Sequence, residues 1–126
     1  MTNLLPNSRR PDVSFHQSGR IDITAHVAKL LHLQQGDVIG IMLSGGEYML
    51  YVRLRANERV GRHEGQVFPT NKGKRHTNNF RAYSRRICQA MIHAAGVSGT
   101  ARLPVGAPLS INDTIAIPII YKYNLQ

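Results

Sequence analysis

The stretch GRIDITAHVAKLLHLQQGD, residues 19–37, decides the fold of this chain. Ile21 and Ile23 alternate with polar neighbours, which is the period of a strand with one buried face. Thr24 follows as a helix N-cap, because its hydroxyl accepts a hydrogen bond from the first turn. The next apolar positions keep a helical spacing at Val27, Leu30 and Leu31. Gly36 suits the left-handed residue that ends a helix, so the stretch predicts a strand, a short capped helix and a glycine turn.

Strands are predicted on both sides of this stretch. An alternating apolar pattern precedes it, and two apolar runs joined by a Ser-Gly-Gly-Glu turn follow it. The four predicted strands are residues 13–15, 20–23, 38–43 and 48–54. The order over residues 13–54 is therefore β-β-α-β-β.

A degraded copy of the same pattern occupies residues 66–121. Ser84 stands where Thr24 caps the first helix, and Gly96 stands where Gly36 ends it. The copies align without gaps only between these caps, because the second hairpin has a longer loop. The copy is predicted to have strands at 66–70, 80–83, 100–105 and 114–121 and a helix at 84–95. Two independent β-β-α-β-β segments are the alternative to a pseudo-repeat.

Length and composition predict one domain. The chain has 126 residues and 42% hydrophobic residues, enough for a core without disulfides. We expect a flexible basic arm at residues 1–11 and a single domain at 12–126, built of the pseudo-repeats 13–54 and 66–121. The fold is predicted to be mainly β with two short helices, and small and barrel-like. No apolar run approaches the roughly 20 residues that span a bilayer, and no signal peptide is recognisable, which favours a cytoplasmic protein without a membrane partner.

Positive charge is concentrated in one segment. The net charge is +9, and the segment from Arg53 to Arg86 holds ten basic residues against two acidic ones. Such a field is expected of a surface that binds a polyanion. Twelve of the sixteen basic residues are arginine, the side chain that grips phosphate or guanine with two parallel hydrogen bonds. A solvated face is the alternative reading.

The first half resembles the AbrB/SpoVT family of swapped-hairpin DNA-binding domains. The matching motifs are Gly19-Arg20-Ile21-Asp22-Ile23, Leu31-His32-Leu33-Gln34-Gln35-Gly36-Asp37 and Val38-Ile39-Gly40-Ile41, within residues 13–54. The resemblance implies DNA binding by arginines, with Arg20 at the position of the family's strand arginine. It also implies a dimer that exchanges hairpins. Here residues 66–121 are expected to supply the partner unit, giving a single-chain AbrB-like pseudo-dimer. Thr24 departs from the family, which usually has proline there.

Two basic groups are candidate nucleic-acid contacts beside Arg20. The polar loop after residue 70 is suited to track phosphates, and the start of the second helix attracts anions through its backbone amides. The candidate binding residues are Arg20, Arg62, Lys72, Lys74, Arg75, Arg81, Arg85 and Arg86. Phe80 and Tyr83 flank Arg81 as aromatics do in single-strand binders. Core packing is nevertheless the favoured role for these two aromatics.

No constellation of catalytic or metal-binding residues is recognisable. The six histidines lack ligand spacing, and Cys88 is interpreted as a small buried apolar residue. Glu58 and Glu64 lie in the basic connection, where ion pairing explains them. We therefore predict no enzyme activity, no metal and no cofactor.

The leading hypothesis is a DNA-binding protein that contacts duplex DNA mainly through Arg and Lys on phosphates. A transcriptional regulator or a mobile-element accessory factor fits that description, with homodimerisation left open. Two alternatives are a protein-interaction or assembly module with a basic face, and a binder of RNA or single-stranded DNA.

Overall fold

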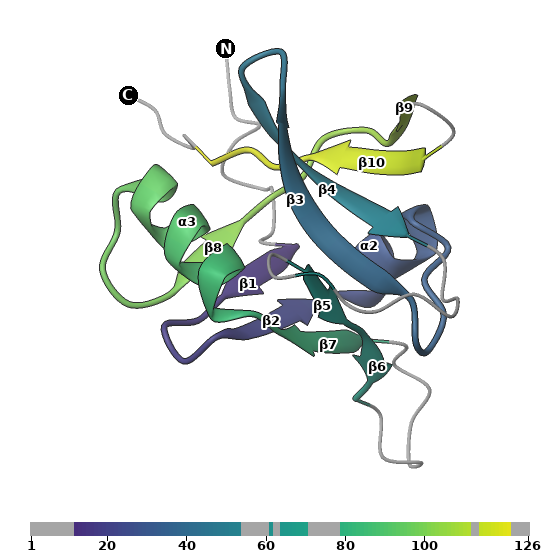
Figure 1. Ribbon diagram of the computed structural model, residues 1–126, viewed down its shortest axis with the longest axis horizontal. Coiled ribbons are helices and arrows are strands. Elements are labelled where there is room, and N and C mark those ends of the chain that lie inside the picture. The colour runs from purple at the N-terminus through teal and green to yellow at the C-terminus, as the bar shows by residue number, and fades with distance from the viewer. Residues whose placement is uncertain (1–11, 54–60, 62–63, 71–78, 112–113, 122–126) are drawn as a thin grey trace, which may run out of the picture.

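A computed structural model describes residues 12–53, 61, 64–70, 79–111 and 114–121, and these residues form two antiparallel sheets and two helices (Figure 1). We call the sheet that contains the first hairpin sheet A. Its strands are β1 (Val13–Phe15), β2 (Arg20–Ile23), β6 (Phe68–Pro69), β7 (Phe80–Tyr83) and β8 (Ala101–Leu103). They lie in the order β6-β7-β2-β1-β8.

Sheet B lies across sheet A and has five strands as well (Figure 1). They are β3 (Val38–Ser44), β4 (Glu47–Arg53), β5 (Glu64–Gln66), β9 (Leu109–Ile111) and β10 (Thr114–Pro118). Their order is β5-β3-β4-β10-β9. The short strand β9 pairs with β10 and lies between the predicted strands 100–105 and 114–121, where no strand was predicted. The prediction of a mainly β fold with two short helices is confirmed.

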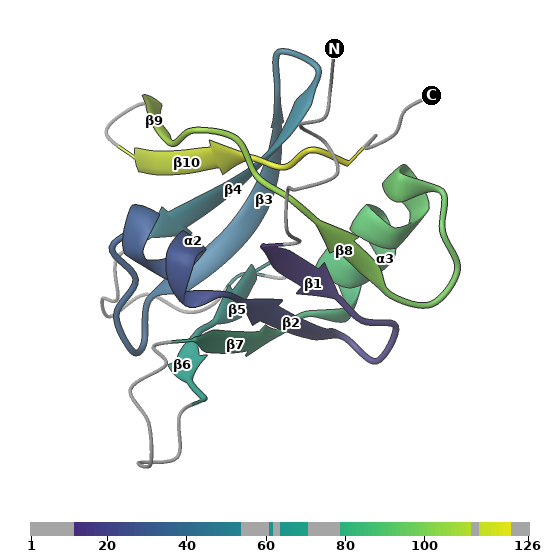
Figure 2. The same cartoon turned by 180° about the vertical axis from the view of Figure 1, so that it is seen from behind.

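The two helices begin at the predicted caps. The Thr24 hydroxyl accepts from the backbone amide of Val27 at 3.4 Å to start α2 (Ala25–Leu30), and Ser84 accepts from Ile87 at 3.2 Å to start α3 (Arg85–Ala95). Gly96 ends α3 with a φ of 72°, as predicted. Turned by 180°, the molecule again shows the helices on opposite sides, α2 near β4 and α3 near β8 (Figure 2).

The helix α2 ends before Gly36, which corrects the prediction. The chain leaves the helix at Leu31, and His32 takes the left-handed conformation with a φ of 54°. Leu31 and Leu33 are both buried. Residues two apart on a helix point to nearly opposite sides, so a continued helix would expose one of the two leucines. The turn at His32 lets both enter the core.

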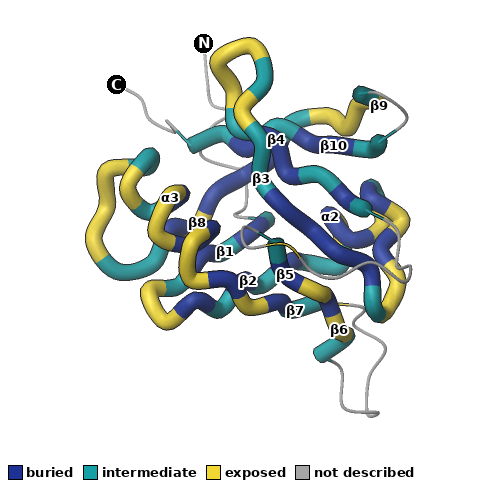
Figure 3. The backbone as a smooth tube through the Cα atoms, viewed as in Figure 1, coloured by how far each residue is buried: buried dark blue, intermediate teal, exposed yellow. Residues whose placement is uncertain are grey.

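The core lies between the sheets, where the buried stretches of both meet (Figure 3). Both halves of the chain supply it. Its fully buried large side chains include Phe15, Ile21, Ile23, Leu31, Ile39, Leu50, Val67, Met91 and Ile117. Ile21 and Ile23, the apolar residues of the predicted strand 20–23, are both among them.

The sheets are not closed into a barrel, which corrects the barrel-like prediction. Two narrow links join them. Val67 separates β5 in sheet B from β6 in sheet A, and a single bridge joins Val105 to Ile119. To close a barrel, the strands of the two sheets would have to pair along a continuous ladder at both links. The strands β6 and β8 of sheet A are too short for this, with two and three residues.

Strands from the two halves of the chain are interleaved. Each of four ladders joins a strand from residues 13–54 to one from 64–121. These ladders are β2 with β7, β1 with β8, β3 with β5, and β4 with β10. The match between the two halves shifts by one residue in the strand that precedes each helix cap. Ile23 and Tyr83 both come directly before a cap, but Ile23 is 1% exposed and Tyr83 is 56% exposed. Neither α2 nor α3, the helices in the described ranges, is long and apolar enough to cross a membrane.

Candidate nucleic-acid interface

The outer side of sheet A carries three arginines. Inward residues alternate with outward ones, so Ile21 and Ala82 are buried opposite each other while their neighbours face out. In the outward rows, Asp22 is paired with Arg81 and Ser14, Ser14 with Arg102, and Arg20 with Tyr83. We call this surface the arginine face and define it by Ser14, Arg20, Asp22, Arg81, Tyr83 and Arg102.

Asp22 binds the two candidate arginines Arg20 and Arg81. Its Oδ1 accepts from Arg81 Nε at 2.7 Å, and its Oδ2 accepts from Arg20 Nε at 3.1 Å. Partial burial acts to raise the pKa of Asp22, but the hydrogen bonds and charges of Arg81, His16 and Arg20 outweigh it and lower the pKa. Asp22 is therefore an ionised carboxylate at neutral pH that holds two guanidinium groups side by side.

A histidine completes this cluster. His16 Nε2 lies 2.9 Å from Asp22 Oδ2 and 3.2 Å from Arg20 Nη2, and Nδ1 lies 3.3 Å from the Thr100 hydroxyl. Arginine only donates, so Nε2 accepts from Arg20 in one tautomer and donates to Asp22 in the other. The ring thus contacts both Asp22 and Arg20 and ties them to Thr100.

Two aromatic side chains lie at the edge of the arginine face. Phe68 is paired with Arg81 across β6 and β7, and Tyr83 follows Arg81 by two residues, so all three side chains face outward. The Phe68 and Tyr83 rings are stacked with centroids 6.1 Å apart and planes at 21°. Their exposed fractions are 37% and 56%. The predicted core role therefore holds for Phe80, which packs partly on the core, and is wrong for Tyr83.

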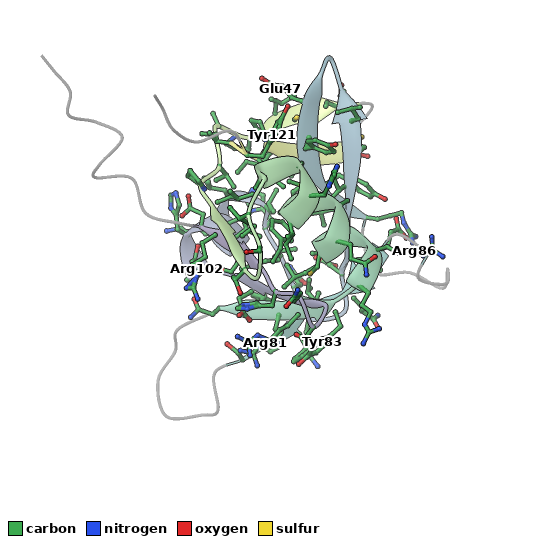
Figure 4. The ribbon with its side chains drawn as sticks, turned by 90° about the vertical axis from the view of Figure 1, so that its left-hand side faces the viewer. Glu47, Arg81, Tyr83, Arg86, Arg102 and Tyr121 are labelled. Atoms are coloured by element: carbon green, nitrogen blue, oxygen red, sulfur yellow. The ribbon has the colours of Figure 1, made fainter. Side chains whose placement is uncertain are left out.

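The two arginines at the start of α3, Arg85 and Arg86, are exposed. The Arg85 side chain packs against Gly19, whose φ of 102° favours glycine and where an added Cβ would lie 3.1 Å from Arg85 Cγ. Arg86 borders a small apolar pocket of about 220 Å³ beside Met42 and Tyr48. Figure 4 shows Arg81 and Tyr83 together on one side of the molecule and Arg86 on another.

The remaining candidates lie outside the described residues. These are Arg62, Lys72, Lys74 and Arg75. The residues that flank the loop 71–78 are described: Thr70 donates its backbone amide to the Asn79 carbonyl at 2.9 Å. Thr70 and Asn79 therefore lie side by side next to β6 and β7, at the aromatic edge of the arginine face.

Arg53 belongs to the basic segment but has a structural partner. Its Nη2 donates to Glu64 Oε1 at 2.7 Å, and the Tyr51 hydroxyl donates to Glu64 Oε2 at 2.6 Å. Hydrogen bonds from Arg53, and secondarily from Tyr51 and the Gly61 amide, lower the pKa of Glu64 to about 2 despite partial burial. Burial, and then the bond to Glu64, raise the pKa of Tyr51 to about 12. The predicted ion pairing of Glu64 is confirmed.

Reactive groups are poorly placed in the described part of the chain. Cys88 is fully buried, and burial raises the pKa of its thiol to about 11, far from the thiolate that a nucleophile needs. No three His, Cys, Asp or Glu side chains among the described residues come together as metal ligands.

Sequence reasoning missed Arg102 and Phe68 as members or neighbours of the arginine face. Arg102 lies between buried Ala101 and Leu103, so alternation within the predicted strand 100–105 was a usable signal.

In comparisons with known proteins, no family model, curated protein or solved structure matches this chain.

Proposed function

We propose that this protein binds nucleic acid, with duplex DNA as the main ligand, and that the arginine face makes the contact. The observation that carries the proposal is the Asp22 carboxylate, which orients Arg20 and Arg81 on the outer side of one sheet. Three arginines and one aspartate give this face a net charge of +2, and one of the arginines, Arg81, belongs to the segment from Arg53 to Arg86 that holds most of the chain's positive charge. Asp22 binds the Nε atoms, and Arg20 Nη2 lies 3.2 Å from His16 Nε2, so the remaining Nη donors of the two guanidinium groups can bind other acceptors such as phosphate oxygens.

The AbrB-like pseudo-dimer is part of this proposal. Four ladders between the halves support it, because strands in a swapped-hairpin dimer pair across the two units. In this arrangement Arg20 lies on the ladder between β2 and β7, at the junction of the units. The one-residue slip places Tyr83 outward where Ile23 points inward. The contact surface is therefore asymmetric, and so is the expected DNA footprint.

A regulatory or mobile-element accessory role fits binding without catalysis. Contacts to phosphates position a protein on DNA without reading sequence. Arg20 and Arg81 are also long enough to reach base edges once the backbone is held. We expect moderate sequence preference on top of a strong general affinity.

Salt dependence of duplex binding tests the proposal. For each phosphate contact the slope of log affinity against log salt changes by about 0.9. Replacing Arg20 and Arg81 together by alanine is expected to reduce that slope by about two. Arg86→Ala is the matched comparison, because this exposed arginine lies away from the arginine face.

Anisotropy titrations between 50 and 200 mM salt, roughly the range where such contacts dominate, measure the slope. Circular dichroism of each variant checks the fold. Absence of duplex binding at low salt, or equal slopes for the wild type and the double variant, would refute the proposal. Binding of an acidic protein in place of DNA would instead favour the assembly-module alternative.

A further inference from the structure

The stacked pair of Phe68 and Tyr83 is exposed instead of packing in the core, and the Tyr83 side chain also forms a hydrogen bond with Arg81. Both rings lie on the solvent side of sheet A, at its β6 edge. Tyr83 is more than half exposed, whereas Ala82, on the opposite face of the same strand, is buried in the core. An exposed aromatic pair flanked by arginines is the composition of surfaces on which nucleobases stack.

Resting on the nucleic-acid binding proposed above, we propose that Phe68 and Tyr83 form a stacking site for an unpaired base next to the duplex. The rings are stacked with their planes at 21°, so a base can stack on the outer face of either ring. Every base has an aromatic face, and this site therefore accepts any of the four.

The neighbouring arginines complete a nucleotide-sized site. Arg81 lies opposite Phe68 and two residues before Tyr83, and Arg20 lies directly opposite Tyr83. Side chains opposite each other in an antiparallel ladder have Cβ atoms about 5 Å apart. A base on Tyr83 thus has its own phosphate within reach of Arg81 or Arg20, and the next phosphates continue along the arginine face.

The small size of the aromatic pair determines the kind of nucleic acid. One pair of rings holds one or two bases, whereas binders of long single strands line a groove with several aromatics. The arginine row from Arg81 through Asp22 and Ser14 to Arg102 crosses four strands and suits the backbone of a duplex. The preferred substrate is a duplex that ends in a short single-stranded overhang.

The edge of the sheet favours a base over a second protein strand. An exposed edge strand usually invites pairing with another chain. Here β6 is only Phe68–Pro69, and proline has no amide hydrogen to donate to a ladder. Together with the nearby positive charge, this argues for a planar, anionic ligand.

The test compares three DNA ligands of the same sequence with the whole protein. They are a blunt duplex, the duplex with a three-nucleotide overhang, and the single strand. We expect the overhang duplex to bind about tenfold more tightly than the blunt one, the gain of one good base–aromatic stack. A 2-aminopurine at the first overhang position is expected to lose fluorescence on binding, as a stacked base does. A ribonucleotide overhang is included to distinguish RNA from DNA ends.

Variants assign the gain to the rings. Phe68→Ala, which lies beside the arginine face, is expected to abolish the overhang advantage and the quenching while leaving blunt-duplex affinity unchanged. Tyr83→Ala is expected to abolish both as well, and also to weaken blunt-duplex binding because Tyr83 belongs to the arginine face. Tyr83→Phe keeps the ring and is expected to keep both. Leu109→Ala is the matched control, because it removes an apolar side chain that is 44% exposed on sheet B.

The outcomes separate this inference from the proposed function. If the blunt duplex does not bind, the proposed function fails first. If the blunt duplex binds but the overhang adds nothing, or if Tyr83→Ala keeps the quenching, the stacking site is wrong. If Tyr83→Ala instead dissociates a dimer of the free protein in sedimentation and spares the overhang gain, the pair is a protein contact and the inference is overturned.

Discussion

At the scale of single residues, we expect Asp22 to affect the proposed DNA binding and the stability in opposite directions. Its carboxylate holds Arg20 and Arg81 in the fold, and in the proposed complex it would compete with phosphates for the same guanidinium groups. A half-exposed ion pair contributes modestly to folding, about 0.5 kcal/mol. An anion that lies near bound phosphates opposes binding by roughly 1 kcal/mol at high dielectric.

We therefore expect Asp22→Asn to bind duplex DNA about fivefold more tightly and to unfold at slightly lower urea. Removal of the negative charge strengthens the field, and loss of the ion pairs weakens the link between β2 and β7. Fluorescence anisotropy and urea denaturation measure the two effects. Asp22→Glu keeps the charge and serves as the control. Weaker DNA binding by Asp22→Asn would mean that orientation of the arginines matters more than charge.

Glu64 gives the molecule a dependence on acid. Its folded pKa is about 2, below the ordinary value of 4.5. The folded state therefore favours the charged form, so the stabilisation is complete above pH 4.5 and is lost as the pH falls towards 2. The side chain is 11% exposed, so this ion pair is worth more than a surface pair.

We expect Glu64→Gln to reduce the free energy of unfolding at pH 7 by about 1–2 kcal/mol, after allowance for solvent screening. The difference from the wild type is expected to shrink between pH 4.5 and pH 2. Urea denaturation at several pH values measures it. A difference that stays constant over that range would show that Glu64 is not the titrating group.

At the scale of elements, the helix caps were the most predictable features. A hydroxyl before a helical apolar spacing is a local signal, and both Thr24 and Ser84 cap as predicted. The short strands β5, β6 and β9 were less predictable, because two or three residues gain their stability from a distant partner. The outward direction of Tyr83 was hard to predict for the same reason. Phe80 and Tyr83 are three residues apart in one strand, so they face opposite sides of the sheet, and only the pairing with β2 decides which of them faces the core.

Ser84 is expected to matter more than Thr24. Its hydroxyl is buried, accepts from Ile87 at 3.2 Å and starts a helix whose first turn holds two arginines and no acid. Ser84→Ala leaves a buried amide unpaired and is expected to cost about 1–2 kcal/mol. Thr24→Ala is expected to cost less, because its bond is longer, at 3.4 Å, and more exposed. Thermal unfolding compares the two, and Ser84→Asp is the variant that retains an acceptor. Equal losses would contradict this order.

At the scale of the whole molecule, interleaved strands make each half dependent on the other. Sheet A takes β1 and β2 from the first half and β6, β7 and β8 from the second. We expect fragments 1–60 and 61–126 to be unfolded when separate and to form one complex when mixed. Circular dichroism and size-exclusion chromatography measure this. A dispersed NMR spectrum from either fragment alone would contradict it.

The location of the candidate site could be predicted only in part for the same reason. The sequence places positive charge between residues 53 and 86 and marks Arg20 through its motif. It does not reveal that Asp22 joins Arg20 to Arg81, 59 residues away, or that Glu64 takes up Arg53. Those contacts follow from register between distant strands, which a local pattern does not encode.

The ladder between β2 and β7 has a thermodynamic consequence for any polyanion that binds there. Arg20 belongs to one half of the chain and Arg81 to the other, so a ligand that grips both acts as a clamp across their boundary. It binds only the assembled state, and mass action then raises the melting temperature with ligand concentration. While such a ligand is bound, the two halves of the chain cannot separate without releasing it. The dissociation rate of the ligand therefore sets an upper limit on the rate at which the halves of the bound protein separate.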